Sequence, residues 1–114
     1  MGELQVTARM RIPPGGFEAF EALARKCLAV AREIDSGTLQ YDWFVDEQRT
    51  ACVVRERYRD AAAALEHVAN LGEETRAELA AAGMSLEFYG DVSDALIEAT
   101  KGADATFYRA WQSL

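Results

Sequence analysis

The chain opens with a strict alternation of apolar and polar side chains and then changes to a helical repeat. Over residues 4–12 every second side chain is apolar, from Leu4 to Ile12, which is typical of a strand with one buried face. The Pro-Pro-Gly-Gly turn at 13–16 ends this strand. Apolar residues then recur at helical spacing from Phe17 to Ile34, which predicts an amphipathic helix of about 18 residues.

The next segment is predicted to be a hairpin followed by a broken helix. Residues 38–46 and 50–58 have strand character, and the short loop between them predicts a β-hairpin. Asp60 is the predicted N-cap of the following helix. This helix is expected to break at Asn70-Leu71-Gly72 and to restart over 73–82.

The end of the chain carries shorter elements. Gly83 stands where a glycine commonly ends a helix, and residues 84–89 alternate as a fourth strand. Ser93 is a candidate cap for a short helix that runs through Thr100. Residues 105–112 are either a fifth strand or a tail that packs elsewhere.

This order predicts one α+β domain over residues 1–114. The elements up to residue 92 follow the order β-α-β-β-α-β, and residues 93–114 form a C-terminal extension. The natural closure is a ferredoxin-like sandwich, in which both helices cover one face of a four-stranded antiparallel sheet. With 114 residues, the chain is too short for two separate cores.

Charge and cysteine content exclude several classes of partner. The formal net charge of −7 would repel phosphate backbones, so nucleic acid is not an expected partner. The apolar runs are too short for a membrane span, and no secretory leader is visible. Cys27 and Cys52 are expected to be buried, reduced thiols in a cytoplasmic protein. With one histidine and no Cys-x-x-Cys, no metal site is expected.

Helices on one side leave the other face of the sheet open, and both strand faces carry large side chains. Such a face predicts a homodimer, and the alternative is a monomer in which the C-terminal segment closes it. Glu56 and Tyr58 are assigned to the open face, although alternation alone does not decide the orientation of the third strand. The predicted helix-side set includes Met10, Leu39, Tyr41, Trp43 and Phe88, and the open set includes Arg9, Phe44, Val54, Glu56, Tyr58, Glu87 and Tyr89.

The hairpin and the second helix resemble the antibiotic biosynthesis monooxygenase family. The similarity lies in Gly37-x-x-x-Tyr41-Asp42, in the run Val-Val-Arg-Glu-Arg-Tyr-Arg-Asp-Ala-Ala-Ala-Ala-Leu-Glu-His over 53–67, and in Phe-Tyr-Gly-Asp-Val over 88–92. It covers residues 4–92. The resemblance implies a dimeric α/β barrel, in which two ferredoxin-like subunits pack sheet to sheet.

Members of this family include cofactor-independent monooxygenases that act on phenols, anthrones and quinols, and haem-degrading enzymes. The haem-degrading branch has a second histidine in the later helix and a tryptophan where Tyr58 stands. His67 is the only histidine of this chain, so haem degradation is not expected. The resemblance therefore implies chemistry without a cofactor.

Two side chains are candidate catalytic groups. His67 is the only group with an ordinary pKa near neutrality, which fits a general base, although a lone histidine is commonly a packed or surface residue. Glu56 beside Tyr58 would have a raised pKa on an inward face and would serve as base or substrate anchor. The alternative for Glu56 is a salt bridge with Arg9 or another arginine.

Other residues are candidates for substrate binding. Tyr41, Trp43 and Tyr89 would stack on a flat aromatic ligand, or else they simply belong to the core. Arg9 would bind an oxyanion unless it forms an ion pair. Asn70 would donate to a substrate carbonyl, although Asn in this context is first a helix stop.

Three functions remain open. The first is cofactor-free oxidation of a small aromatic or quinol-like molecule in a cavity of a homodimer. The second is a non-catalytic dimeric binding or interaction module of the same fold. The third, isomerase- or decarboxylase-like proton transfer, cannot be separated from the first by sequence. An enzyme is expected to enclose roughly 300 Å³ or more with convergent polar groups, whereas a binding module needs less.

Overall fold

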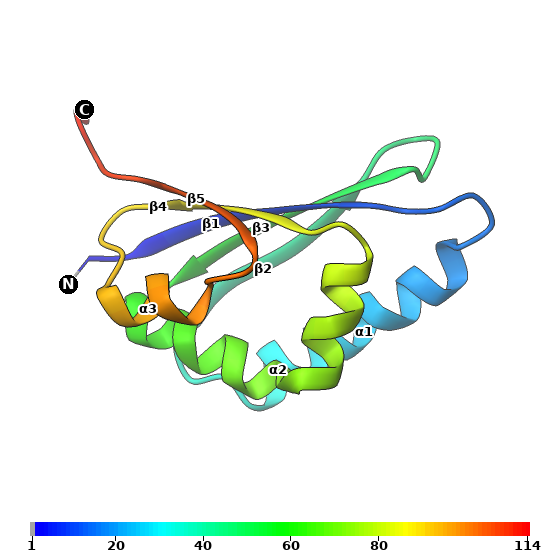
Figure 1. The fold of residues 1–114 in the computed structure, drawn as a ribbon, viewed down its shortest axis with the longest axis horizontal. Coiled ribbons are helices and arrows are strands. Elements are labelled where there is room, and N and C mark those ends of the chain that lie inside the picture. Colours follow the sequence, from blue (N-terminus) through cyan, green and yellow to red (C-terminus); the bar gives the residue numbers. More distant parts are fainter. Residues whose placement is uncertain (1) are drawn as a thin grey trace.

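The computed structural model describes residues 2–114 and has the predicted order of elements, including the short helix after Ser93 (Figure 1). The elements of the predicted sandwich are β1 (Leu4–Arg11), α1 (Phe17–Glu33), β2 (Thr38–Val45), β3 (Ala51–Tyr58), α2 (Ala61–Ala81) and β4 (Ser85–Tyr89). The C-terminal extension adds α3 (Asp94–Ala99) and β5 (Asp104–Tyr108). The α+β ferredoxin-like prediction is therefore confirmed.

The strands form one sheet in the order β2-β3-β1-β4-β5. The first four strands pair antiparallel, as predicted. β5 pairs parallel with β4 and so adds a fifth strand at the edge of the predicted four-stranded antiparallel sheet. The reason for the parallel pairing is the helical crossover through α3, which returns the chain to the same end of the sheet and imposes a parallel neighbour. Of the two alternatives for the C-terminal segment, the fifth strand is the one observed.

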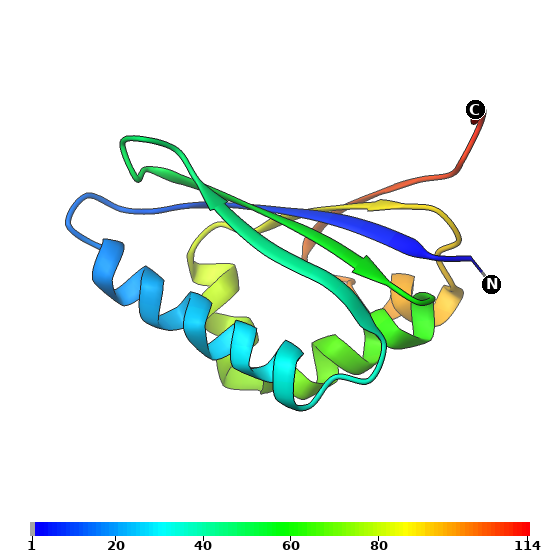
Figure 2. The same ribbon diagram turned by 180° about the vertical axis from the view of Figure 1, so that it is seen from behind.

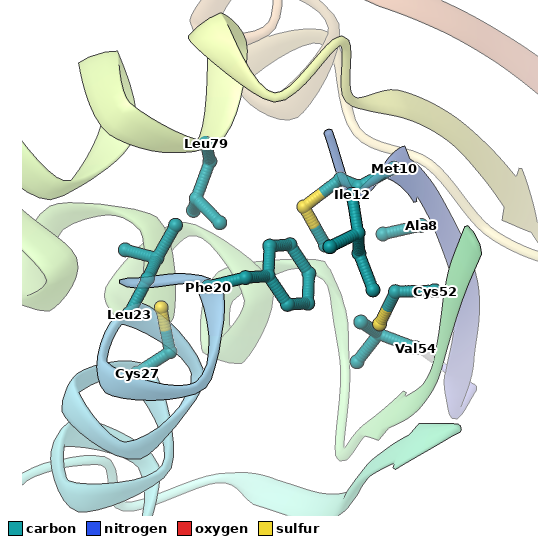
Figure 3. Close-up of a cluster of buried hydrophobic side chains, with 9 residues drawn as sticks. All are labelled: Ala8, Met10, Ile12, Phe20, Leu23, Cys27, Cys52, Val54 and Leu79. Carbon is teal, nitrogen blue, oxygen red and sulfur yellow. The ribbon is translucent and has the colours of Figure 1, made fainter. Parts of the chain in front are cut away.

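All three helices lie on one side of the sheet, and its other face is open (Figures 1 and 2). A core cluster fills the space between the layers. In Figure 3 the ring of Phe20 from α1 points toward Met10 and Cys52 from the sheet, and Leu23 and Cys27 of α1 belong to the same buried cluster. Burial of this apolar surface is what holds α1 on the sheet. Both cysteines are free and buried, as predicted.

The third strand is turned opposite to the prediction. Glu56 of β3 is paired with Tyr41 of the neighbouring strand β2. Glu56 is only 8% exposed and Tyr58 only 2% exposed, so both side chains face the helices. The assignment of Glu56 and Tyr58 to the open face is therefore wrong. Arg55 and Arg57 take the open face because their charged heads must stay hydrated or paired. Arg57 binds Glu3 there at 2.9 Å.

We call the helix-free side of the sheet the open face. Leu39 lies beside a register shift at Thr38/Gln40 and is half exposed, so it is not the core residue that alternation predicts. Val54 was expected on the open face and is buried on the helix side. By strand register, the open face comprises Gln5, Thr7, Arg9, Arg11, Gln40, Asp42, Phe44, Ala51, Val53, Arg55, Arg57, Ser85, Glu87, Tyr89, Asp104, Thr106 and Tyr108.

The local signals for helix ends are confirmed. The Asp60 carboxylate accepts the Ala63 amide at 2.9 Å, and the Ser93 hydroxyl accepts the Leu96 amide at 3.1 Å. The predicted break in α2 is a kink at Gly72, which has φ 83° and ψ 162°. Glycine is required there because side-chain-bearing residues rarely adopt this backbone conformation. Within residues 2–114, no helix is long and apolar enough to cross a membrane.

Candidate functional site

A cavity of about 240 Å³ lies between the sheet and the α2–α3 layer of a single chain. Most of its wall is apolar, with contributions from Val6, Leu79 and Phe88. Four of its polar groups gather at one end, and we call it the His67 cavity after one of them. The polar end is formed by Tyr41, Glu56, Tyr58 and His67.

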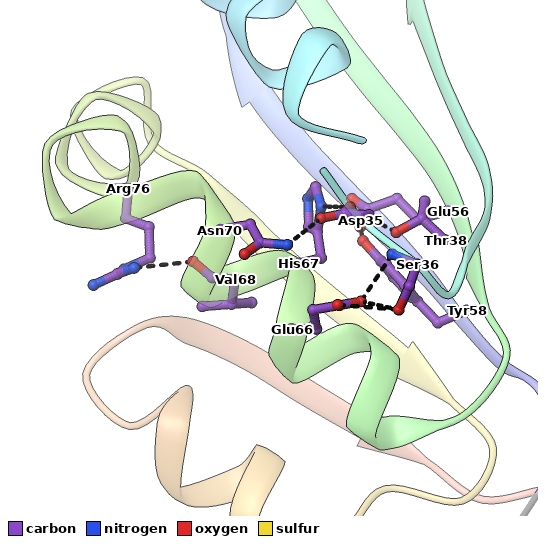
Figure 4. A network of polar contacts seen from close by, with 10 residues as sticks. All are labelled: Asp35, Ser36, Thr38, Glu56, Tyr58, Glu66, His67, Val68, Asn70 and Arg76. Carbon is purple, nitrogen blue, oxygen red and sulfur yellow. Dashed lines mark hydrogen bonds and ion pairs between the residues drawn. The ribbon is translucent and has the colours of Figure 1, made fainter. Parts of the chain in front are cut away.

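Asp35 orients the imidazole of His67 (Figure 4). His67 Nδ1 lies 2.6 Å from Oδ2 of Asp35, which stands in the loop between α1 and β2. Two further donors hold this carboxylate: the Asn70 amide at 2.8 Å and the Thr38 hydroxyl at 2.7 Å. Burial opposes the charged form of Asp35, but these three hydrogen bonds outweigh it and lower the pKa of the carboxyl below its ordinary value.

His67 itself is held neutral near pH 7. Burial lowers its pKa below 6.5, against the opposing effect of Asp35. An ionised Asp35 requires a proton on Nδ1, so the lone pair of the neutral ring is on Nε2. Nδ1 is taken up by Asp35 and the ring lines the cavity, so Nε2 is the nitrogen that can face a ligand. This is the arrangement of an oriented base that faces an apolar chamber.

Glu56 and Tyr58 form a second polar pair beside His67. The Tyr58 hydroxyl donates to Oε1 of Glu56. Burial raises the pKa of Glu56 to about 7, although the Tyr58 hydrogen bond acts in the opposite direction. The pKa of Tyr58 is raised by burial and by the neighbouring charge of Glu56, so its hydroxyl stays protonated. Glu56 is thus a carboxyl group that exchanges its proton near neutrality.

Aromatic rings pack around the imidazole. The Tyr41 ring meets His67 edge-on with centroids 4.7 Å apart, and the Tyr58 ring is 5.6 Å away. Burial raises the pKa of Tyr41, so this hydroxyl is also neutral. The rings fix the plane of His67 and keep the polar end of the cavity largely free of water.

Four of the predicted site residues are not at the cavity. Trp43 packs in the core against Phe20 and Tyr41, and its indole nitrogen has no hydrogen-bond partner among the described residues. Asn70 binds Asp35 and so positions His67 indirectly. Arg9 and Tyr89 lie on the open face, where both contact Glu87. His67, Glu56, Tyr58 and Tyr41 are the predicted residues that the fold brings together.

Sequence reasoning missed two contributions to the site. Asp35 was not predicted, because nothing in the surrounding sequence marks it as a partner of a histidine 32 residues away. The C-terminal extension supplies a wall of the cavity through Leu96, Ala99 and Thr100. Within residues 2–114, no group of three or more histidine, cysteine or acidic side chains has the arrangement of a metal site.

Comparison with known proteins places this geometry in a family. The family model described as "Antibiotic biosynthesis monooxygenase" matches residues 4–78, a span that contains Asp35, Glu56 and His67. A search of curated proteins gave no match.

Solved structures share the fold at low sequence identity. MupZ from Pseudomonas fluorescens has a TM-score of 0.82 at 22% identity, and the alignment covers 100% of this chain and 94% of MupZ. Rv0793 from Mycobacterium tuberculosis has a TM-score of 0.66 at 23% identity, with 82% and 99% covered. PA3566 from Pseudomonas aeruginosa has a TM-score of 0.61 at 23% identity, with 82% and 97% covered. With a family model that matches well over half of its length, the chain belongs to the antibiotic biosynthesis monooxygenase family.

Proposed function

We propose that this chain is a cofactor-independent monooxygenase that acts on a small aromatic or quinol-like substrate in the His67 cavity. One observation carries the proposal: a neutral histidine, oriented by a buried carboxylate, presents its free nitrogen to an apolar chamber beside a carboxyl group with a pKa of about 7. This combination supplies a base, an acid and a dry volume in one place.

The first step is proton removal. Nε2 of His67 takes a proton from a ring hydroxyl or from an activated C–H of the substrate. Asp35 stabilises the resulting imidazolium, much as a buried carboxylate does in other base–carboxylate pairs. The electron-rich anion stays in a site from which water is largely excluded. Because water does not stabilise its charge there, the anion is more reactive toward O₂.

The substrate itself supplies the electrons. The anion passes one electron to O₂, and recombination of the two radicals forms a C–O bond to a peroxide. For a substrate with an activated methylene group, loss of water breaks the O–O bond and leaves a carbonyl, so that CH₂ and O₂ become C=O and H₂O. Protonated Glu56 gives its proton to the departing hydroxide to form water, and the proton that His67 took then passes to the Glu56 carboxylate, so both groups return to their starting forms.

The size of the cavity limits the substrate. About 240 Å³ accommodates one or two fused aromatic rings. The wall contributes few polar groups outside the His67 end, so the body of the substrate is expected to be apolar.

Oxygen uptake with a panel of one-ring and two-ring hydroquinones, with and without a chelator, tests this proposal. We expect uptake that the chelator does not reduce. His67→Ala, His67→Gln and Glu56→Gln should slow it, whereas Glu98→Gln, an exposed change on α3, should not. Circular dichroism checks that each variant is folded. Unchanged rates in the folded His67 and Glu56 variants would remove the site assignment.

One observation favours a second function, a non-catalytic small-molecule-binding module. The cavity is smaller than the roughly 300 Å³ expected of an enzyme site. In that case hydroquinones would bind to the protein without any consumption of oxygen, and the His67 and Glu56 variants would change affinity alone.

The homodimer and the cytoplasmic location are part of the same proposal. The open face carries Phe44 at 54% exposure and Tyr89 at 37%, together with several arginines. Aromatic and arginine side chains are enriched at interfaces, which supports sheet-to-sheet pairing. The walls of the His67 cavity come from one chain, so a partner would cover the sheet rather than complete this cavity. The two free thiols, Cys27 and Cys52, support a reducing compartment.

A further inference from the structure

The two ends of the His67 cavity differ in exposure as well as in chemistry. His67, Glu56 and Tyr58 are buried. The wall also includes Ala80 of α2 and Ala99 of α3, which are both exposed. The cavity therefore meets solvent between α2 and α3, and a ligand would enter with its leading edge toward His67.

Arg76 is the one charged side chain in this outer part of the wall. It is half-buried, and its Nη1 donates to the Val68 carbonyl at 2.9 Å, close to the kink at Gly72 (Figure 4). This bond ties the guanidinium to the first half of α2 and leaves its other N–H groups free for a ligand.

Arg76 has no acidic partner in the part of the chain that the structure describes. No Asp or Glu of residues 2–114 lies within 4 Å of its guanidinium, in a chain with a net charge of −7. Two acidic side chains on the same helices are paired with lysines: Glu78 binds Lys26 at 2.6 Å, and Glu98 binds Lys101 at 3.0 Å. A half-buried cation without a counter-ion, at the entrance of an apolar cavity, is arranged to receive an anion.

We propose that the ligand of the His67 cavity is an acid, whose carboxylate or similar planar anion is bound by Arg76 while its ring lies against His67 and Glu56. The guanidinium matches a carboxylate through two parallel hydrogen bonds. This inference rests on the cavity and the substrate class of the proposed function, and it adds the charge of the substrate and its orientation.

The charges of the two ends favour this orientation. Ionised Asp35 lies behind His67, and Glu56 becomes negative when it loses its proton. A ligand anion at that end would meet like charge in a poorly solvated volume. The same anion at Arg76 is paired and partly hydrated, so the acid group is kept outward and the oxidisable ring inward.

Anaerobic calorimetry tests the inference without turnover. The probes are 1,4-dihydroxy-2-naphthoate and its methyl ester, which share one quinol ring system and differ in charge. We expect the full-length protein to bind the acid about tenfold more tightly than the ester, a difference of about 1.4 kcal/mol. Arg76→Gln should abolish this preference and leave ester binding unchanged, and Arg76→Lys should retain part of it. Arg32→Gln, an exposed change on α1 with the same loss of charge, should retain all of it.

Two results would overturn the inference. The first is that the wild-type protein binds acid and ester with equal affinity, or binds neither. The second is that Arg76→Gln weakens the binding of acid and ester equally. The outcome is separable from that of the proposed function. A preference for the acid that depends on Arg76, without oxygen uptake in air, would support the acid site and contradict the monooxygenase. Oxygen uptake with equal rates for acid and ester would support the monooxygenase and contradict the acid site.

Discussion

Asp35 accepts the Nδ1 proton of His67 across 2.6 Å, from a loop that precedes the histidine by 32 residues. Both side chains are buried: the exposed fractions are 0% for Asp35 and 4% for His67. The pair joins the end of α1 to the middle of α2 and so couples the packing of the two helices to the orientation of the proposed base.

Asp35→Asn should therefore lower the rate of quinol oxidation by at least about a hundredfold. The amide cannot stabilise the imidazolium by charge, and its NH₂ group would face donors from Asn70 and Thr38. Oxygen uptake under saturating substrate measures the effect. Asp42→Asn is the matched control because Asp42 is an exposed residue of β2 that bonds Gln40. An equal loss in both variants would contradict the role given to Asp35.

The pH dependence of the rate should be bell-shaped. The rate falls on the acid side when His67 becomes protonated, at a pH below 6.5 because burial lowers its pKa. It falls on the alkaline side near pH 7, where Glu56 loses the proton that it must donate. Tyr58→Phe removes a hydrogen bond that lowers the pKa of Glu56, so the alkaline limb should move to higher pH.

Tyr89→Phe is the control for this shift. Tyr89 makes the same kind of hydrogen bond to a carboxylate, Glu87, but does so on the open face. Its removal should leave both limbs of the profile in place. A profile that moves equally in the Tyr58 and Tyr89 variants would contradict the assignment of the alkaline limb to Glu56.

Glu56 should also make the stability depend on pH. Its pKa is about 7 in the folded chain against 4.5 for an exposed glutamate, so the folded state binds the proton more tightly. The free energy of unfolding of the wild-type protein, relative to Glu56→Gln, should be highest below pH 4.5. It should fall by on the order of 3 kcal/mol as the pH rises through 7. Urea titrations of both proteins at pH 4.5, 6 and 8 measure this difference, and parallel curves would contradict it.

The fold could be predicted because its signals are local. Asp60 and Ser93 cap helices by bonds to residues three positions ahead, and Gly72 and Gly83 have the positive φ values that break or end a helix. The periodicity of apolar residues, which differs between strands and helices, predicts the order of the elements. None of these signals requires knowledge of what lies across the sheet.

The site could be predicted only in part, because the orientation of β3 was reversed. Period-two alternation is symmetric, and it fixes only that Arg55 and Arg57 point opposite to Glu56 and Tyr58. Burial of the two arginines would cost more free energy than burial of Tyr58 and Val54. The arginines therefore stay on the solvent side and decide the orientation of the strand. The role of Asp35 could not be predicted from the sequence, because its contact with His67 forms only when α1 and α2 are packed together.

The open face should support a dimer in solution. We expect light scattering at micromolar concentration to give twice the chain mass of 12.6 kDa. Val53→Glu, a half-buried position within the open face, should shift the protein toward the monomer. Ile34→Glu is the control, because Ile34 is 58% exposed at the end of α1, on the helix side. A monomeric wild-type protein would contradict the pairing.

Close contact between the Asp35 loop and α2 depends on Gly37. A Cβ added at Gly37 would lie 2.5 Å from the Cβ of Ala63, so Gly37→Ala must push the loop away from the helix. We expect a loss of about 1–3 kcal/mol in the free energy of unfolding, and a lower oxidation rate as Asp35 moves from His67. Ala63→Gly in the same chain removes the clashing methyl group. The double variant should recover oxidation, although the glycine costs about 1 kcal/mol of helix stability. A double-mutant cycle measures this coupling, and purely additive effects would contradict the contact.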